Sequence, residues 1–294
     1  MFLKLLGFQQ TTKPERPLRD KFDTDSKIAS ASPRLVRQSV DEILASPLTS
    51  ILFESAEWRD GQQLKIIPSA KSIIDERHIR SPAEYDSKHH CIIAKRDVLP
   101  RKIVINHELR HAWQTVALDT RRYTVSDPYT HFMFKQIIEA DAHAYSNIIY
   151  DMEDEDAQIP LTPEKTALYV ERYRRDFLRF LLGDIFLTRD FLNIELEKYK
   201  YSHIRTVSYD SHPFSWVNRG KEKPEQPHAR PERVTEAIEQ LAIVGLTEHP
   251  VRFFSSNDAQ DITEMLFDAH SKHPIIAPKL AEIYENLRGH YGPR

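Results

Sequence analysis

Five consecutive residues, His107-Glu108-Leu109-Arg110-His111, place two imidazoles four positions apart with a carboxylate directly after the first. Residues i and i+4 of an α-helix lie on one face, one turn apart. Both imidazoles can therefore reach a single ion at the roughly 2.0–2.1 Å of a zinc–histidine bond. Glu108 is rotated by about 100° from His107. There its carboxylate can take a proton from a water molecule beside the metal without being a ligand itself.

The residues around this motif predict the helix that such a geometry requires. Pro100 suits the first turn, because the N–H that proline lacks would have no partner there. Apolar Ile103, Val104 and Ile105 lead into the motif and predict a helix that is buried rather than exposed. Small Ala112 leaves space beside an ion. A helix that holds two histidines on a partly buried face through hydrogen bonds alone is the alternative interpretation.

A catalytic zinc ion needs a third protein ligand, and the sequence narrows its source. In metzincins this ligand is a third histidine of the same segment, preceded by a glycine. Gln114 and Ala117 occupy those two positions, so that arrangement is excluded. A second long helix is predicted at about 131–150. Three of its residues are candidate ligands: Glu139, Asp141 and His143.

These candidates differ in their direction on the predicted helix. Glu139 and Ala142 form a Glu-x-x-Ala pattern, and small residues suit a helix that packs closely against another helix or a metal. Asp141 points about 200° away from Glu139, as expected of a residue that supports a ligand or carries a surface charge. His143 lies one turn beyond Glu139 on the same face. It can be the ligand, a hydrogen-bonding neighbour of the site, or a partly buried histidine without such a role.

The order and spacing of the two motifs resemble those of the gluzincin metallopeptidases, which carry His-Glu-x-x-His on one helix and a glutamate ligand on the next. The chain is most similar to the compact bacterial ImmA/IrrE-like metallopeptidase domains, over about a third of its length. The resemblance implies Zn²⁺ held by His107, His111 and Glu139, with Glu108 as general base for hydrolysis of a peptide bond. The chain departs from this group at position 143, where it has His and the group often has Asn. This difference leaves the identity of the third ligand open.

The resemblance also implies a zincin-like core, in which a small β-sheet packs on the active-site helix and is followed by the ligand-bearing helix. An edge strand of such a sheet can pair with an extended peptide, and residues 89–94 are the expected edge. The expected partner is therefore a peptide or protein substrate.

Stabilisation of the oxyanion of a tetrahedral intermediate needs a further donor outside the ligand set. His212, in Tyr209-Asp210-Ser211-His212-Pro213, is the predicted donor, with Tyr209 and Arg230 as alternatives. A simple His-Pro turn is the other interpretation of this segment.

The elements around these motifs predict an α+β fold that is mostly helical. Segments 63–68 and 89–94 are short and apolar and predict strands, separated by a polar connection. Further helices are predicted to begin at Pro33, to cover 163–182 before Gly183, and to cover 188–201.

Three regions are expected along the chain. Residues 1–32 are polar and charged and predict a flexible lead-in. Residues 33–200 are expected to form the metallopeptidase core, and residues 201–294 a helical region packed on it. The acidic run at 151–156 is interpreted as a solvated loop, because it lacks the glycine and the alternating ligands of a calcium-binding loop.

The composition excludes other classes of protein. The formal net charge of −3 gives no strong attraction to nucleic acid or to anionic lipid. Cys91 is the only cysteine, so neither an intramolecular disulfide nor a cysteine-based zinc site can form. No segment approaches the roughly 18 apolar residues of a membrane span, and the apolar start of the chain is too short for a signal peptide. A cytoplasmic location is expected, with signal-independent export still compatible with the sequence. The oligomeric state is not predicted.

Two classes of function therefore compete. The first is a zinc-dependent peptide hydrolase with Glu108 as base. The second is a non-catalytic regulatory or binding protein with a degenerate or structural metal site, in which His143 completes a closed shell of four ligands. A helical scaffold with both histidines in its core is a third interpretation, and the metal content of the protein separates it from the other two.

Overall fold

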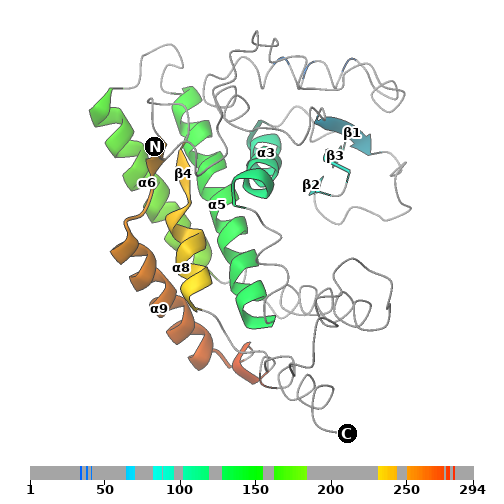
Figure 1. Cartoon of the computed structure of the whole chain (residues 1–294). Helices are drawn as coiled ribbons and strands as arrows, with labels where there is room; N and C mark the ends of the chain where they lie inside the picture. The colour runs from blue at the N-terminus through cyan, green and yellow to red at the C-terminus, as the bar shows by residue number, and fades with distance from the viewer. Residues whose placement is uncertain are drawn as a thin grey trace, which may run out of the picture. The chain divides into compact units, whose positions relative to one another are not determined.

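The computed structural model describes residues 34, 38, 41, 64–69, 82–87, 89–95, 102–118, 128–154, 162–183, 231–243, 250–274, 276–278 and 281. In this part of the chain the fold is mostly helical with a small sheet, which confirms the predicted α+β class (Figure 1). The chain divides into two compact units. Unit 1 comprises 1–120, 138–177 and 241–253, and unit 2 comprises 121–137, 178–240 and 254–294.

The sheet of unit 1 has three strands: β1 (Lys65–Ser69), β2 (Ala83–Asp86) and β3 (Cys91–Lys95). Its order is β1-β3-β2, with β1 parallel and β2 antiparallel to β3. The expectation that 89–94 forms an edge strand is therefore wrong, because β3 is paired on both sides. Among the strands that the structure describes, β1 and β2 form the edges of the sheet.

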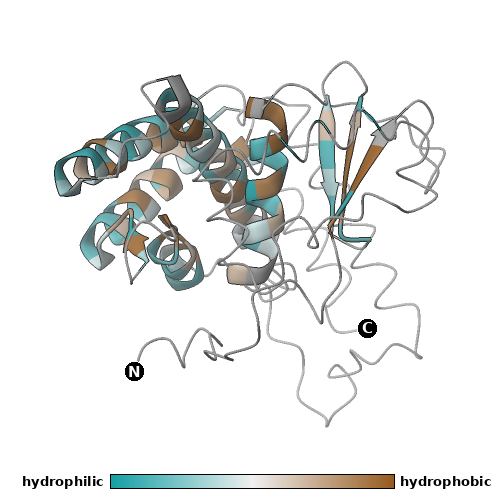
Figure 2. Ribbon diagram, turned by 90° about the horizontal axis from the view of Figure 1, so that it is seen from above, coloured by the Kyte–Doolittle hydropathy of each residue, from teal (hydrophilic) through white to brown (hydrophobic). Residues whose placement is uncertain are grey.

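Strand β3 lies in the centre because it is apolar on both faces. Cys91, Ile92, Ile93 and Ala94 are all buried, as expected of a strand that is covered on both sides. Figure 2 shows brown, apolar colouring along part of the sheet, whereas one strand is largely teal. The strand starts two residues later than predicted, because His90 adopts a left-handed conformation (φ 50°) in the turn after β2.

Strand β2 was missed in the sequence, where its residues were assigned to a polar connection. Of its four residues only Ala83 is buried, so the apolar alternation that identifies a strand is absent. Pairing with β3, and not its own composition, makes this segment a strand.

Helix α3 (Lys102–Ala117) carries the His107–His111 motif and contacts β2 and β3. Its buried apolar residues are Ile105, Leu109, Ala112 and Trp113. Their spacing is that of one helical face. Polar residues on the other sides of α3 are buried as well (Asn106, Glu108, Arg110 and Gln114), so the prediction of a buried helix is confirmed. The two histidines are only partly exposed.

Helix α5 (Pro128–Asp154) is longer at both ends than the predicted 131–150. It starts at a proline, which suits the first turn, and the following residues contain no further Pro or Gly. The interpretation of the acidic run at 151–156 as a loop is wrong for residues 151–154, which extend the helix. Residues 155 and 156 lie outside the described residues.

Helix α6 (Pro163–Leu181) matches the predicted 163–182 to within one residue. The Oγ1 of Thr162 accepts a hydrogen bond from the N–H of Lys165 (3.2 Å) and caps its start. At its end, a Cβ at Gly183 would lie 2.7 Å from the carbonyl oxygen of Arg179. A residue without Cβ is therefore required there.

The C-terminal part contains α8 (Pro231–Glu239), the two-stranded pair of β4 (Ala242–Ile243) and β5 (Val251–Arg252), and α9 (Ser256–Lys272). In unit 2, α8 packs against α9, which begins with a capping box of Ser255 and Asp258. The predicted lead-in at 1–32 and the helix at 188–201 lie outside the described residues. Among the helices that the structure describes, none is both long and apolar enough to cross a membrane.

Candidate metal centre

Helix α3 brings the two histidines of the motif together. The Nε2 atoms of His107 and His111 lie 3.1 Å apart, and the two rings are nearly perpendicular, at 87°. The i, i+4 spacing on one helical face predicts this approach. Both ring nitrogens point to the same place, as the ligands of one ion must.

Glu139, on α5, supplies a carboxylate oxygen to the same place. Its Oε2 lies 3.5 Å from Nε2 of His107 and 3.4 Å from Nε2 of His111. With the 3.1 Å between the two nitrogens, the three atoms form a nearly equilateral triangle. Two ligands of a tetrahedral zinc ion, each bonded at roughly 2.0–2.1 Å, are about 3.3–3.4 Å apart. The donor set and its spacing therefore fit such an ion.

The same three groups form a tightly coupled charge cluster. Burial alone would raise the pKa of Glu139, but the imidazoles of His111 and His107 outweigh it and hold that pKa well below its usual range. Burial alone would lower the pKa of His111, but the Glu139 carboxylate outweighs it and raises the pKa to about 9. A metal bound here must displace the proton of His111, as is general for histidine ligands.

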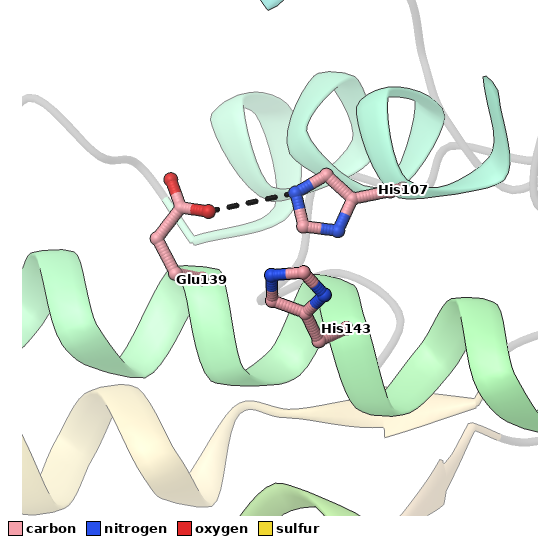
Figure 3. A group of neighbouring side chains, drawn as sticks. All are labelled: His107, Glu139 and His143. Carbon is pink, nitrogen blue, oxygen red and sulfur yellow. Dashed lines mark ion pairs between the residues drawn. The ribbon is translucent and has the colours of Figure 1, made fainter. Parts of the chain in front are cut away.

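His143 lies beside this triangle, one turn after Glu139 on α5. Ligand atoms of His107, Glu139 and His143 all lie within 4.8 Å of one another, so these residues could hold a metal ion (Figure 3). The His107 and His143 rings are 4.3 Å apart between centroids. Burial and the charge of His107 lower the pKa of His143 to about 4. Its imidazole is therefore neutral at pH 7 and keeps a lone pair for a metal.

Glu108 is held next to the two ligand histidines by the sheet. It is buried, and its Oε2 accepts a hydrogen bond of 2.8 Å from the backbone N–H of Tyr85 on β2. Burial raises the pKa of Glu108 above its usual value, although His111 and His107 oppose this. The carboxylate is thus a stronger base than one in water.

Asp141 is not directed at the ligand triangle but into the core behind it. Its carboxylate receives the Nε of Arg110 on Oδ2 and the NH2 of Arg110 on Oδ1, both at 2.8 Å. Gln114 donates to Oδ2 at 2.5 Å and the Tyr173 hydroxyl donates to Oδ1 at 2.6 Å. Of the two roles predicted for Asp141, the structure excludes the surface charge, because its side chain is fully buried.

Arg110 is fully buried and lies between two aromatic rings. Its guanidinium carbon is 3.7 Å from the centroid of Trp113 and 4.1 Å from that of Tyr145. The NH2 also donates to the carbonyl oxygen of Ala242 at 3.1 Å. Arg110 thus links α3 to α5 and to the start of β4.

The structure brings together all the site residues predicted on these two helices: His107, Glu108, His111, Glu139, Asp141 and His143. His212, with its alternatives Tyr209 and Arg230, lies outside the described residues. The sequence analysis missed three contributors. Tyr85 acts through its backbone, which carries no sequence signal. The sequence does not distinguish Gln114 and Tyr173 from other polar residues of helices, because their partners come within reach only in the folded structure.

Comparisons with known proteins identified no relative of this chain. No protein-family model matches the chain, and no match was found among curated proteins or solved structures. The resemblance to gluzincins therefore rests on the motif residues and on the geometry of this site alone.

Proposed function

We propose that this protein is a zinc-dependent metallopeptidase with Zn²⁺ held by His107, His111 and Glu139. The observation that carries the proposal is the triangle of ligand atoms, with sides of 3.1, 3.4 and 3.5 Å. Three protein ligands leave one tetrahedral position for water or substrate, which is the arrangement of catalytic zinc sites. The zincin-like core implied by the resemblance is part of this proposal.

When bound, zinc would supply a Lewis acid that polarises the scissile carbonyl and acidifies an attacking water molecule. The Glu108 carboxylate takes the proton of that water and delivers it to the leaving amine. Its burial makes it a stronger base, and the N–H of Tyr85 fixes one of its oxygens.

An extended peptide is the substrate that the sheet favours. Strand β2 lies at the edge of the sheet and contacts α3, so a peptide that pairs with it runs beside the metal ligands. The bond from the N–H of Lys95 to the carbonyl of Pro82 sets the register of β2 against β3. Backbone groups of alternate residues, Ala83 and Tyr85, therefore point away from β3. The N–H of Tyr85 is bonded to Oε2 of Glu108, so it is not available to such a peptide.

Two substitutions test this function. Glu108→Gln keeps the size of the side chain but removes the base, so we expect stoichiometric zinc with peptide hydrolysis reduced by about 10²–10⁴-fold. His111→Ala is expected to lose the zinc itself. Hydrolysis by Glu108→Gln at the wild-type rate would disprove the role of Glu108, and undiminished zinc in His111→Ala would disprove the ligand set. Wild-type protein that binds no zinc would disprove the proposal as a whole.

A structural metal site in a regulatory or binding protein is the second candidate. The position of His143, with its ligand atom within 4.8 Å of those of His107 and Glu139, favours it, because a fourth protein ligand would close the shell to water. X-ray absorption of the zinc-loaded protein counts the nitrogen ligands. Three histidines around the metal, together with loss of one in His143→Ala, would support this candidate against the hydrolase.

A further inference from the structure

Gln114 is a buried amide one turn after His111 on α3, with 1% of its surface exposed. Its Nε2 donates to the carbonyl oxygen of Ile138 at 2.8 Å and to Oδ2 of Asp141 at 2.5 Å. Both partners can only accept hydrogen bonds. The amide nitrogen must therefore lie on this side, and the amide oxygen on the other.

The amide oxygen meets the ring of His111. The distance from Oε1 of Gln114 to Nδ1 of His111 is 2.8 Å. Because an amide oxygen only accepts, Nδ1 must carry the proton. When a metal displaces the second proton of His111, the lone pair that binds it is therefore that of the opposite nitrogen, Nε2, which is the atom that faces His107 and Glu139.

We propose that Gln114, held by Asp141, is a positioning residue that fixes which nitrogen of His111 binds the metal and how its ring is turned. This inference rests on the metal-binding part of the proposed function and is independent of hydrolysis. In many metal sites a carboxylate contacts the histidine ligand directly. Here the neutral amide of Gln114 makes that contact, and the charged Asp141 lies one hydrogen bond further from the histidine.

Asp141 can hold the amide firmly because its own hydrogen bonds are complete. Arg110 provides two donors, and Gln114 and Tyr173 provide one each. A carboxylate has about four acceptor positions. Rotation of Asp141 away from Gln114 would therefore break bonds to a buried, charged arginine, which is costly.

The two histidine ligands differ in this respect. The Nδ1 of His107 is buried, and no acceptor for it lies among the residues that the structure describes. Within the described residues, His111 therefore has a partner that orients its ring, whereas Nδ1 of His107 has none. Partners that orient a histidine ligand typically contribute 10–100-fold to metal affinity.

Gln114→Met tests the inference, because methionine keeps the length of the side chain but has neither the acceptor for His111 nor the donor for Asp141. Gln136→Met is the matched control. Gln136 is also fully buried, on α5, and its amide makes no hydrogen bond within the described part of the chain. The zinc dissociation constant of each folded protein is measured by competition with a chelator.

We expect Gln114→Met to raise the zinc dissociation constant by about 10–100-fold and Gln136→Met to leave it within about 2-fold. In zinc-loaded wild-type protein with ¹⁵N-labelled histidine, we expect one ring N–H resonance shifted downfield and a cross-peak from it to the Gln114 side chain. That resonance should be absent from Gln114→Met.

A lower melting temperature of Gln114→Met with wild-type zinc affinity would show a purely structural residue and overturn the inference. If Gln114→Met does not fold, the wild-type spectrum decides, because absence of the downfield resonance also overturns it. Wild-type protein that binds no zinc would instead disprove the proposed function, so the two failures are distinguishable.

Discussion

The Nε of Arg110 and the Oδ2 of Asp141 are 2.8 Å apart, in an ion pair with both side chains fully buried. Burial of two charges costs several kcal/mol per ion, and only mutual pairing with further hydrogen bonds offsets this cost. Here the pair joins the helix with the histidine motif to the helix with Glu139. The position of the third ligand relative to the first two therefore depends on this contact.

Removal of one partner of this pair should be strongly destabilising. For Asp141→Asn or Arg110→Met we expect a loss of about 3–5 kcal/mol in the free energy of unfolding, because a buried charge then has no counter-charge. Urea denaturation measures this loss. The control is Arg172→Met, which removes a partner of Asp151 in the exposed pair between α6 and α5, at 3.6 Å. That loss should stay below about 1 kcal/mol, and equal losses at both sites would contradict the importance of burial.

The contact between Tyr85 and Glu108 predicts an effect of a backbone change on the base. Tyr85→Pro removes the N–H that binds Oε2 of Glu108. This N–H is not used in pairing with β3, and proline is tolerated at such edge positions. We expect peptide hydrolysis to fall by roughly 10–100-fold, as for loss of a hydrogen bond to a charged group, while zinc affinity stays unchanged.

Tyr85→Phe is the matched control for that variant. It keeps the backbone N–H and removes only the hydroxyl, which lies 2.9 Å from Nδ1 of His90. Activity of Tyr85→Phe should remain close to that of the wild type. Equal loss in both variants would assign the effect to the side chain and not to the backbone hydrogen bond.

Local sequence patterns predicted the helical part of the site, because helical periodicity relates residues only a few positions apart. The spacing of His107 and His111 already fixes their approach on one helix. Glu139 was one of three candidates on the next helix, and the resemblance to gluzincins, not periodicity, favoured it. The sheet was predicted less well. The residues of β2 carry no alternating pattern, and only pairing with β3 reveals that 89–94 is not an edge.

The remaining contributors depend on tertiary packing. Nothing in the sequence around Tyr173 indicates that its hydroxyl reaches Asp141, 32 positions earlier in the chain. Likewise, nothing in the motif itself indicates that Arg110 is buried. Its burial between Trp113 and Tyr145 follows from the packing of α5 against α3.

The thiol of Cys91 should be unreactive in the folded protein. It is fully buried in the central strand, and this burial, with the nearby Asp86 carboxylate, raises its pKa to about 12. The thiolate is the reactive form, so a maleimide reagent at pH 7.5 should label the native protein at a small fraction of its rate in urea. Mass spectrometry after timed quenching measures both rates. Rapid labelling without denaturant would show that β3 opens under native conditions.

His270 on α9 should make unit 2 sensitive to acid. It is buried near Phe132, and burial, followed by the charge of His273, lowers its pKa to about 3. In the unfolded chain the pKa is about 6.5. Between these two values the unfolded state binds more protons than the folded state, so stability falls as the pH is lowered through this window.

One proton contributes a slope of up to about 1.4 kcal/mol per pH unit. His270→Phe keeps an aromatic ring beside Phe132 and removes this proton. We expect the difference in unfolding free energy between wild type and His270→Phe to change by that slope between pH 6 and pH 4, and to be constant above pH 7.5. Urea denaturation at each pH measures it. Parallel pH profiles for the two proteins would show that His270 has the same pKa in the folded and unfolded states, because such a histidine contributes no slope.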